Sequence, residues 1–139
     1  MEHSVELMRA AKTIAVVGVS SDRNKASNEV AEYLIKAGYT VYLVNPRETE
    51  IFGMPVYPSV EALPEPVDIV DIFRRPADVP PVVDDAIAAG AKAVWMQLGI
   101  VNEDAAAKAR EAGLEVVMDR CTKIEHWALL AFERASGRA

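Results

Sequence analysis

The fold of this chain is decided by one stretch, residues 12–27, which reads KTIAVVGVSSDRNKAS. Its apolar part, Ile14–Val17, shows no polar alternation, which predicts a strand buried on both faces, as in a parallel sheet. Gly18 stands where such a strand must turn sharply and let a ligand approach the backbone. The residues that follow are small, polar or basic and lead into a helix, whose first N–H groups favour an anion. The stretch therefore predicts a phosphate-binding turn.

Helices and strands alternate along the rest of the sequence. Four further buried strands are predicted, at residues 40–44, 67–73, 92–96 and 114–118, and a short edge strand at 55–57. Helices are predicted at residues 4–11, 27–37, 79–89, 103–112 and from 122 onward, with one helical turn at 59–63. Because crossovers between parallel strands are right-handed, this order predicts an α/β fold with a three-layer, doubly wound parallel sheet. Residues 1–139 are expected to form a single domain.

Particular side chains are expected to begin the helices or to fill the core. The predicted N-caps are Ser4, Asp78 and Asn102, and Thr122 with Glu125 has the spacing of a capping box. Core packing is the expected role of Trp95, Met96 and Trp127, the last with Leu130 and Ala131 on an apolar helix stripe.

Composition limits the classes of function. The formal net charge of −6 over 139 residues argues against binding to nucleic acid or to an anionic membrane surface. No apolar run is long enough for a membrane span, and the N-terminus does not resemble a signal peptide. Cys121 is the only cysteine, which fits a reducing, cytoplasmic environment, and two histidines leave little material for a metal site.

Ligands of an open parallel sheet bind beyond the carboxyl ends of its strands. The residues at these ends are Gly18 to Ser21, Asn45 to Arg47, Phe73 to Pro76, Gln97 to Gly99 and Asp119 to Cys121. Three of these five ends carry arginine in an acidic protein, which suggests a ligand with more than one phosphate. The alternative is that these arginines pair with Asp71, Asp119 and Glu48 and hold the loops in place.

A nicotinamide-binding fingerprint is present only in part. Ser20 and Arg23 stand where its second and third glycines would be, and Asn45-Pro46 replaces the acid expected after the second strand. That acid binds the free hydroxyls of a ribose, so its absence favours a ribose that carries a phosphate. NADP and coenzyme A both have such a ribose, but NADP usually requires the tight glycine pattern. Coenzyme A is therefore favoured.

The sequence also resembles a known family. Residues 15–20 (AVVGVS), 44–46 (VNP), 57–59 (YPS), 67–75 (VDIVDIFRR), 95–100 (WMQLGI) and 119–121 (DRC) are similar to motifs of the small, single-domain coenzyme A-binding proteins. Those proteins are similar in turn to the N-terminal nucleotide-binding domain of the succinyl-CoA synthetase α subunit. The resemblance covers nearly the whole chain and implies a Rossmann-like, CoA-binding domain.

The resemblance also implies a set of ligand-binding residues. They are Gly18, Val19, Ser20, Arg23, Ser27, Asn45, Pro46, Phe73, Arg74, Arg75, Gln97 and Gly99. The nucleotide phosphates are expected near Ser20, Arg23, Ser27 and Arg75. No catalytic residue and no metal ligand is expected.

The family resemblance has a limit, because succinyl-CoA synthetase needs a second domain with a phosphorylated histidine and a β subunit. This chain has neither, so a thiokinase reaction by the chain alone is not expected. The predicted function is binding of coenzyme A or an acyl-CoA. The alternatives are an NADP-dependent oxidoreductase and the nucleotide-binding subunit of a CoA ligase that acts with a separate catalytic chain; a protein partner stays open.

Two residues near the last helix carry separate hypotheses. Cys121 precedes the helix N-terminus, where a thiolate is favoured and could form a mixed disulfide with a bound thiol; the alternative is a small buried side chain. Cys121 and His126 could together act in nucleophilic catalysis. The favoured alternative places Glu125 in the capping box and His126 on a partly exposed face.

Overall fold

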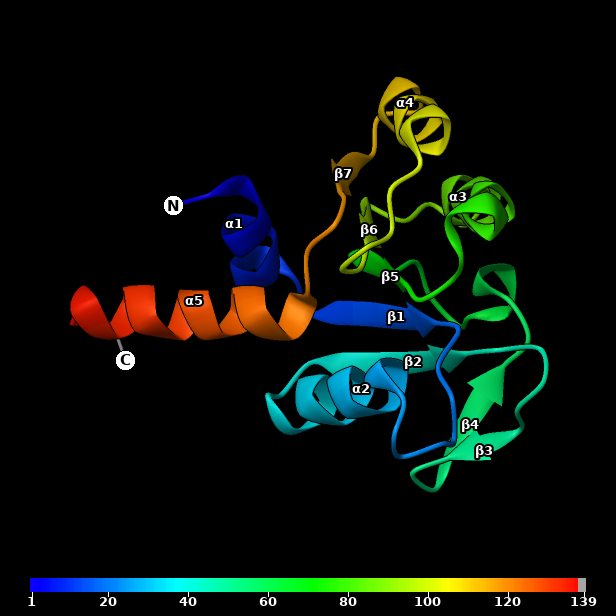
Figure 1. Cartoon of the computed structure of the whole chain (residues 1–139), viewed down its shortest axis with the longest axis horizontal. Coiled ribbons are helices and arrows are strands. Elements are labelled where there is room, and N and C mark those ends of the chain that lie inside the picture. Colours follow the sequence, from blue (N-terminus) through cyan, green and yellow to red (C-terminus); the bar gives the residue numbers. More distant parts are fainter. Residues whose placement is uncertain (138–139) are drawn as a thin grey trace.

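The computed structural model describes residues 1–137 and contains a seven-stranded sheet between two layers of helices (Figure 1). The strands are β1 (Thr13–Val17), β2 (Thr40–Val44), β3 (Glu50–Ile51), β4 (Met54–Tyr57), β5 (Ile69–Ile72), β6 (Ala93–Met96) and β7 (Glu115–Val117). Their order in the sheet is β3-β4-β2-β1-β5-β6-β7, and only the β3–β4 pair is antiparallel. The predicted doubly wound α/β fold is confirmed.

The helices cover both faces of the sheet. Their bounds are α1 (His3–Ala10), α2 (Ala26–Lys36), α3 (Val79–Ala88), α4 (Glu103–Glu111) and α5 (Thr122–Ala135), with short 3-10 turns η1 (Val60–Ala62) and η2 (Pro76–Asp78). Successive residues of β1 point to opposite faces: Ile14 and Val16 pack with α1, α2 and α5, whereas Ala15 and Val17 pack with α3 and α4. This two-sided burial explains the unbroken apolar sequence of the strand.

The direction of strand order changes at β1. The chain passes from β1 to β2 on one side and later returns to β5 on the other side. The carboxyl ends of β2 and β5 therefore flank the end of β1, where α2 begins. Ligands of doubly wound sheets bind at such a switch point, so this edge is where a site is expected.

The helix caps follow the predictions only in part. Asn102 caps α4 as predicted, because its Oδ1 accepts a hydrogen bond from the Ala105 amide at 3.0 Å. Asp78 occupies the N-cap position of α3, as predicted, but its side chain makes no cap bond. Its carboxylate instead accepts from Arg75 Nε at 2.9 Å.

The predicted caps at the chain's first and last helices are wrong. Ser4 lies within α1, and its hydroxyl donates to the carboxylate of Glu125. Because Glu125 turns toward α1, it does not close a capping box with Thr122. The Thr122 hydroxyl instead lies 3.0 Å from Asp71 Oδ2 and 3.1 Å from Gln97 Oε1. Long-range polar contacts have replaced local capping at both helices.

Strand β3 is absent from the sequence-based prediction. It forms a hairpin with β4 through Phe52 and Gly53, both of which have positive φ, 57° and 71°. A two-residue hairpin of this kind normally uses Asn or Gly at its first position, so Phe52 hides the signal. The Arg23 guanidinium lies 5.7 Å from the Phe52 ring centre, within the range of a cation–π contact.

The core prediction holds for two of the three large side chains. Trp95 and Met96 on β6 are fully buried, but Trp127 on α5 is 51% exposed, so its predicted core position is wrong. Leu130 and Ala131 are exposed as well. Trp127 packs edge-on against Tyr33, with ring centres 6.2 Å apart, on the outer side of the α2–α5 contact. Within residues 1–137, no helix combines the length and the apolar character needed to span a bilayer.

Candidate functional site

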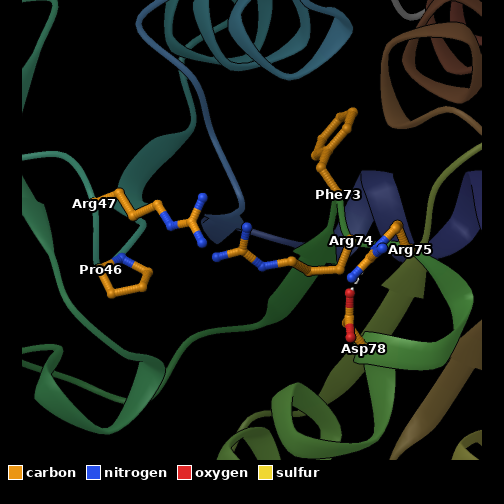
Figure 2. A pocket seen from close by; sticks show the side chains of 6 residues that line it. All are labelled: Pro46, Arg47, Phe73, Arg74, Arg75 and Asp78. Atoms are coloured by element: carbon orange, nitrogen blue, oxygen red, sulfur yellow. Dashed lines mark hydrogen bonds and ion pairs between the residues drawn. The ribbon is translucent and has the colours of Figure 1, made fainter.

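A cleft opens at the switch point, between the ends of β2 and β5. Its volume is about 590 Å³, and its walls are formed by Pro46, Arg47, Phe73, Arg74, Arg75 and Asp78 (Figure 2). Four of these residues, Pro46, Phe73, Arg74 and Arg75, belong to the predicted ligand-binding set. The sheet topology thus brings together two strand ends that lie far apart in the sequence.

Three arginines surround the cleft, but they are not equivalent. Arg75 is paired with Asp78, which leaves that pair close to neutral. Arg47 and Arg74 extend toward each other from the two strand ends (Figure 2), and within residues 1–137 neither has a carboxylate within ion-pair distance. Two cationic groups without partners that face one another favour an anion between them.

The alternative pairing of the arginines is wrong for the three acids that it involves. Asp71 contacts Thr122, Asp119 accepts from the Gly99 amide at 2.7 Å, and Glu48 accepts from the Ser21 amide at 2.7 Å. Arg120, at the end of β7, lies 3.3 Å from Glu2 and 3.5 Å from Glu125. The three acids therefore contact a backbone amide or a hydroxyl group instead of these arginines, and Arg120 pairs with Glu2 and Glu125.

Gly18 ends β1 with a φ of +90°. A Cβ at this position would overlap the carbonyl oxygen of Phe73, and it would lie 3.3 Å from Arg74 Nη1. The Gly18 amide donates to the Val44 carbonyl at 2.8 Å, and the Phe73 amide donates to the Val17 carbonyl at 2.8 Å. The close approach that needs glycine is therefore that of the cleft's own backbone, which sets the position of Arg74.

The loop after Gly18 is held by its own polar side chains. Ser27 Oγ accepts from the Ser20 amide at 3.0 Å, and Asn28 Nδ2 donates to the Ser20 carbonyl at 2.8 Å. Val19 is fully buried, and its carbonyl accepts from Asn45 Nδ2 at 2.8 Å. The structure uses these predicted site residues to fix the loop beside the cleft.

Arg23 lies outside the cleft lining. Its guanidinium donates to both carboxylate oxygens of Glu32, at 2.9 and 3.1 Å, and to Asn28 Oδ1 at 3.2 Å. The sequence suggested that the Arg23 guanidinium binds a phosphate, but in the structure this group forms a bidentate ion pair with Glu32.

Three other predicted residues stabilise strand ends. Asn45 ties β2 to the Val19 carbonyl and accepts from the Arg47 amide at 3.0 Å. Gln97, only 4% exposed, accepts from the Thr122 amide at 3.1 Å. Gly99 has a φ of +78° and lies in the turn that Asp119 supports.

Two residues of the cleft are missing from the set implied by the resemblance. Arg47 is among the strand-end residues of the sequence. That its guanidinium lacks a carboxylate partner among residues 1–137 becomes apparent only once β2 and β5 are placed around β1. Asp78 is expected from the sequence to cap a helix instead. Its short spacing from Arg75 is the signal for the ion pair.

A smaller cavity adjoins the cleft. It measures about 160 Å³ and shares Pro46 and Arg74 with the cleft. Its wall combines the apolar residues Val17, Val44, Pro58, Val60 and Val82 with the polar residues Ser59 and Asp85. The two spaces together offer a cationic part and an apolar part.

The structure buries both Cys121 and His126, the two residues for which the sequence suggested reactive roles. Cys121 is 8% exposed and lies among core residues, as its alternative role requires. His126 is buried, contrary to the expected partly exposed face, and its Nδ1 lies 2.7 Å from the Tyr33 hydroxyl. Burial lowers the pKa of His126. Within residues 1–137, no group of three or more His, Cys, Asp or Glu side chains is placed to hold a metal ion.

Comparison with known proteins identifies the family. The sequence pattern of the CoA binding domain matches residues 12–127. The chain belongs to the CoA binding domain family. The predicted resemblance to coenzyme A-binding proteins is confirmed.

Relatives of this CoA binding domain include small proteins and parts of larger enzymes. It is 36% identical to YneT of Bacillus subtilis (strain 168), over 87% of this chain and 90% of YneT. A structure of a hypothetical protein from Pyrococcus horikoshii OT3 is 42% identical, with a TM-score of 0.88 over 91% of this chain and 89% of that one. The ADP-forming acetate–CoA ligase I of Archaeoglobus fulgidus is 32% identical over 79% of this chain, which spans only 18% of the ligase.

Proposed function

We propose that this protein binds coenzyme A or an acyl-CoA in the cleft between β2 and β5. The observation that carries the proposal is the pair of guanidiniums of Arg47 and Arg74, which have no carboxylate partner in the described part of the chain and lie at the switch point of a CoA binding domain. Coenzyme A presents a pyrophosphate and a ribose 3′-phosphate, which are the anions that such a pair would bind.

The residues of the cleft suggest which part of coenzyme A each of them contacts. The phosphates of the nucleotide are assigned to Arg47 and Arg74, rather than to Arg23 and Arg75, because the latter two have carboxylate partners. In the smaller cavity beside Arg74, the apolar side chains of Val17 and Val82 supply contact surface for the adenine ring. Gly18, Val19, Ser20, Ser27, Asn45 and Pro46 shape the loop and strand ends around the nucleotide, and Gln97 and Gly99 lie along the next strand end.

The proposed ligand-binding unit includes the flanks of the family match. Residues before 12 and after 127 form α1 and most of α5, and these helices pack against each other and against the core. We therefore treat residues 1–139 as one CoA-binding domain. A cytoplasmic location is part of the proposal, because one buried cysteine fits a reducing environment.

No catalytic residue is proposed for this chain. A second candidate function is that of a CoA-binding subunit that acts with a separate catalytic chain, which is favoured by the similarity to part of an ADP-forming acetate–CoA ligase. The oxidoreductase alternative remains a competitor through NADP, whose 2′-phosphate could use the same arginines. These functions differ in ligand or in partner, so binding assays separate them.

The first experiment is thermal unfolding of the purified protein with coenzyme A, acetyl-CoA, dephospho-coenzyme A, NAD and NADP in parallel. A ligand at 100 times its Kd stabilises the folded state by about 2.7 kcal/mol, which should raise the Tm of a domain of this size by roughly 9 °C. The ultraviolet spectrum of the protein is recorded beforehand to detect nucleotide carried through purification.

The expected result is stabilisation by coenzyme A and acetyl-CoA but not by NAD. Loss of the 3′-phosphate in dephospho-coenzyme A should weaken binding by at least about tenfold, since a hydrogen bond to a charged group contributes roughly 1.5 kcal/mol or more. Stabilisation by NADP alone would overturn the proposal in favour of the oxidoreductase.

A further inference from the structure

A buried carboxyl group lies beneath the strand ends that form the site. Asp71 on β5 is fully buried, and its neighbours in the adjacent strands are the apolar residues Val16 and Trp95. Its Oδ1 has no hydrogen-bond partner within residues 1–137, and its Oδ2 lies 3.0 Å from Thr122 Oγ1. A carboxylate in such a setting would be costly, because no cation among the described residues forms an ion pair with it.

The hydrogen count around Thr122 shows where a proton is needed. The Thr122 hydroxyl has one hydrogen but lies within hydrogen-bond distance of two acceptors, Asp71 Oδ2 and Gln97 Oε1 at 3.1 Å. An ionised Asp71 would leave one of these contacts as a repulsion between two oxygens. A protonated Asp71 resolves the conflict, because it donates to Thr122, which then donates to Gln97.

The orientation of the Gln97 amide is fixed by the backbone. The Thr122 amide donates to Gln97 Oε1 at 3.1 Å, which excludes a flipped side chain with its NH₂ group at that position. Gln97 Nε2 therefore faces away from Thr122, and it has no hydrogen-bond partner within residues 1–137. In the sequence, Gln97 directly follows Met96, the last residue of β6, so it lies at the edge of the sheet where ligands of this fold bind.

The titratable side chains at the start of α5 are Cys121, Lys123, Glu125 and His126. The last three of them are engaged elsewhere. Lys123 pairs with Glu29 at 2.6 Å, Glu125 accepts from Ser4, and His126 contacts Tyr33. Burial, only partly offset by the Thr122 hydrogen bond, raises the pKa of Asp71 to about 8.

Asp68, just before β5, shows the opposite behaviour. Partial burial would raise its pKa, but hydrogen bonds from the Lys12 and Thr13 amides and the Lys92 ion pair outweigh burial and lower the pKa. Two carboxyl groups three positions apart in the sequence thus differ in whether their surroundings supply donors.

We propose that Asp71 is the proton donor of a chain, Asp71 to Thr122 to Gln97, that holds the Gln97 amide as a hydrogen-bond donor to the ligand. The inference rests on the proposed function, since the ligand group is taken to be a carbonyl oxygen of the pantetheine arm of coenzyme A. Asp71 and Thr122 are positioning residues, and Gln97 is the residue that touches the ligand.

The first test uses the ligand-free protein. Carboxyl ¹³C NMR, with the signal assigned through Asp71→Asn, should show Asp71 protonated at pH 7 and titrating near pH 8, whereas Asp68 is ionised at pH 7. An Asp71 signal already ionised at pH 6 would overturn the inference. The unfolding equilibrium should show the same proton. Because the folded protein binds it more tightly than the unfolded chain does, the folding equilibrium constant should fall by up to tenfold per pH unit as the pH rises from about 4 to about 8. Asp71→Asn should abolish this component, and Asp68→Asn should retain it.

The second test measures the Kd of coenzyme A between pH 7 and pH 9. Ionisation of Asp71 breaks the chain, so the wild-type Kd should rise about tenfold more over this range than that of Asp71→Asn, which keeps a donor at every pH. Asp68→Asn is the matched control and should follow the wild type. Equal pH profiles for wild type and Asp71→Asn would contradict the positioning role.

Thr122 supplies the remaining arm of the test. Thr122→Val, which removes the hydroxyl, should weaken coenzyme A binding about tenfold at pH 7, and Thr122→Ser should restore it even if the valine variant folds poorly. If wild-type protein fails to bind coenzyme A at any pH, the proposed function and the donor role of Gln97 are overturned together. The ¹³C titration still decides the protonation of Asp71 in that case.

Discussion

Gly18 lies against the backbone of Phe73 so closely that no side chain can stand between them. A Cβ on Gly18 would overlap the Phe73 carbonyl oxygen, and the glycine has a φ of +90°. The end of β1 is therefore packed directly on the end of β5, and the cleft arginine that follows Phe73 is positioned by this contact.

Substitution Gly18→Ala should destabilise the protein severely. Left-handed backbone and overlap with a carbonyl group each contribute about 1–3 kcal/mol, so the free energy of unfolding should fall by more than about 2 kcal/mol. Urea unfolding followed by circular dichroism measures the loss.

Gly113→Ala is the matched control, because Gly113 has nearly the same φ, +91°, but no atom lies within 4 Å of the position that a Cβ would take. It should lose only about 1–2 kcal/mol through backbone strain. Equal losses in the two variants would show that the Phe73 contact has no energetic role.

Arg74→Ala should weaken coenzyme A binding by roughly 10- to 100-fold, the effect of losing one or two hydrogen bonds to a phosphate. Isothermal titration calorimetry at low salt gives the Kd. Arg74→Lys should recover only part of the affinity, because an ammonium lacks the planar fork of a guanidinium.

Arg75→Ala tests whether any positive charge near the cleft contributes to phosphate binding. Arg75 already pairs with Asp78, and its side chain is 85% exposed, so its removal should change the Kd less than about threefold. A larger effect than that of Arg74→Ala would place the phosphate at Arg75, as the family resemblance implied.

The sequence predicts the layers of this fold well because each strand near the centre is buried on both faces. The unbroken apolar run Ile14–Val17 and the glycine after it suffice to place β1. Strand β4 agrees with the strand predicted at 55–57, but β3 and the hairpin turn escape prediction because the turn uses Phe52 at positive φ. Turn rules fail where a residue other than Asn or Gly adopts this conformation.

The site shows the same division. The strand ends that carry it follow from topology, so Pro46, Phe73, Arg74 and Arg75 could be found in the sequence. Which arginines are paired with a carboxylate could not be predicted from the sequence, since Arg23 contacts Glu32 only after α2 has formed. Likewise, the local spacing of Thr122 and Glu125 suggested a cap, whereas Asp71 and Ser4 compete for these side chains in the folded protein.

His126 should make stability depend on pH. Burial lowers its pKa below the ordinary value of 6.5, so the folded protein binds this proton less readily than the unfolded chain. The stabilisation is complete above about pH 6.5 and is lost as the pH falls through and below that value. Unfolding between pH 5 and 8 should show this component in wild type but not in His126→Gln, and His3→Gln, at the exposed second histidine, should keep it.

Glu48→Gln should increase the affinity for coenzyme A. The Glu48 carboxylate accepts a 2.7 Å hydrogen bond from the Ser21 amide, in the loop that the sequence predicts to face a phosphate. A phosphate bound beside this loop would meet that negative charge, so its removal should improve the free energy of binding by about 1 kcal/mol, or roughly fivefold in Kd. Glu50→Gln changes the net charge equally at an exposed position on β3 and should leave the Kd nearly constant. If both variants gain equally, the benefit is one of net charge, and the nucleotide lies away from the Ser21 amide.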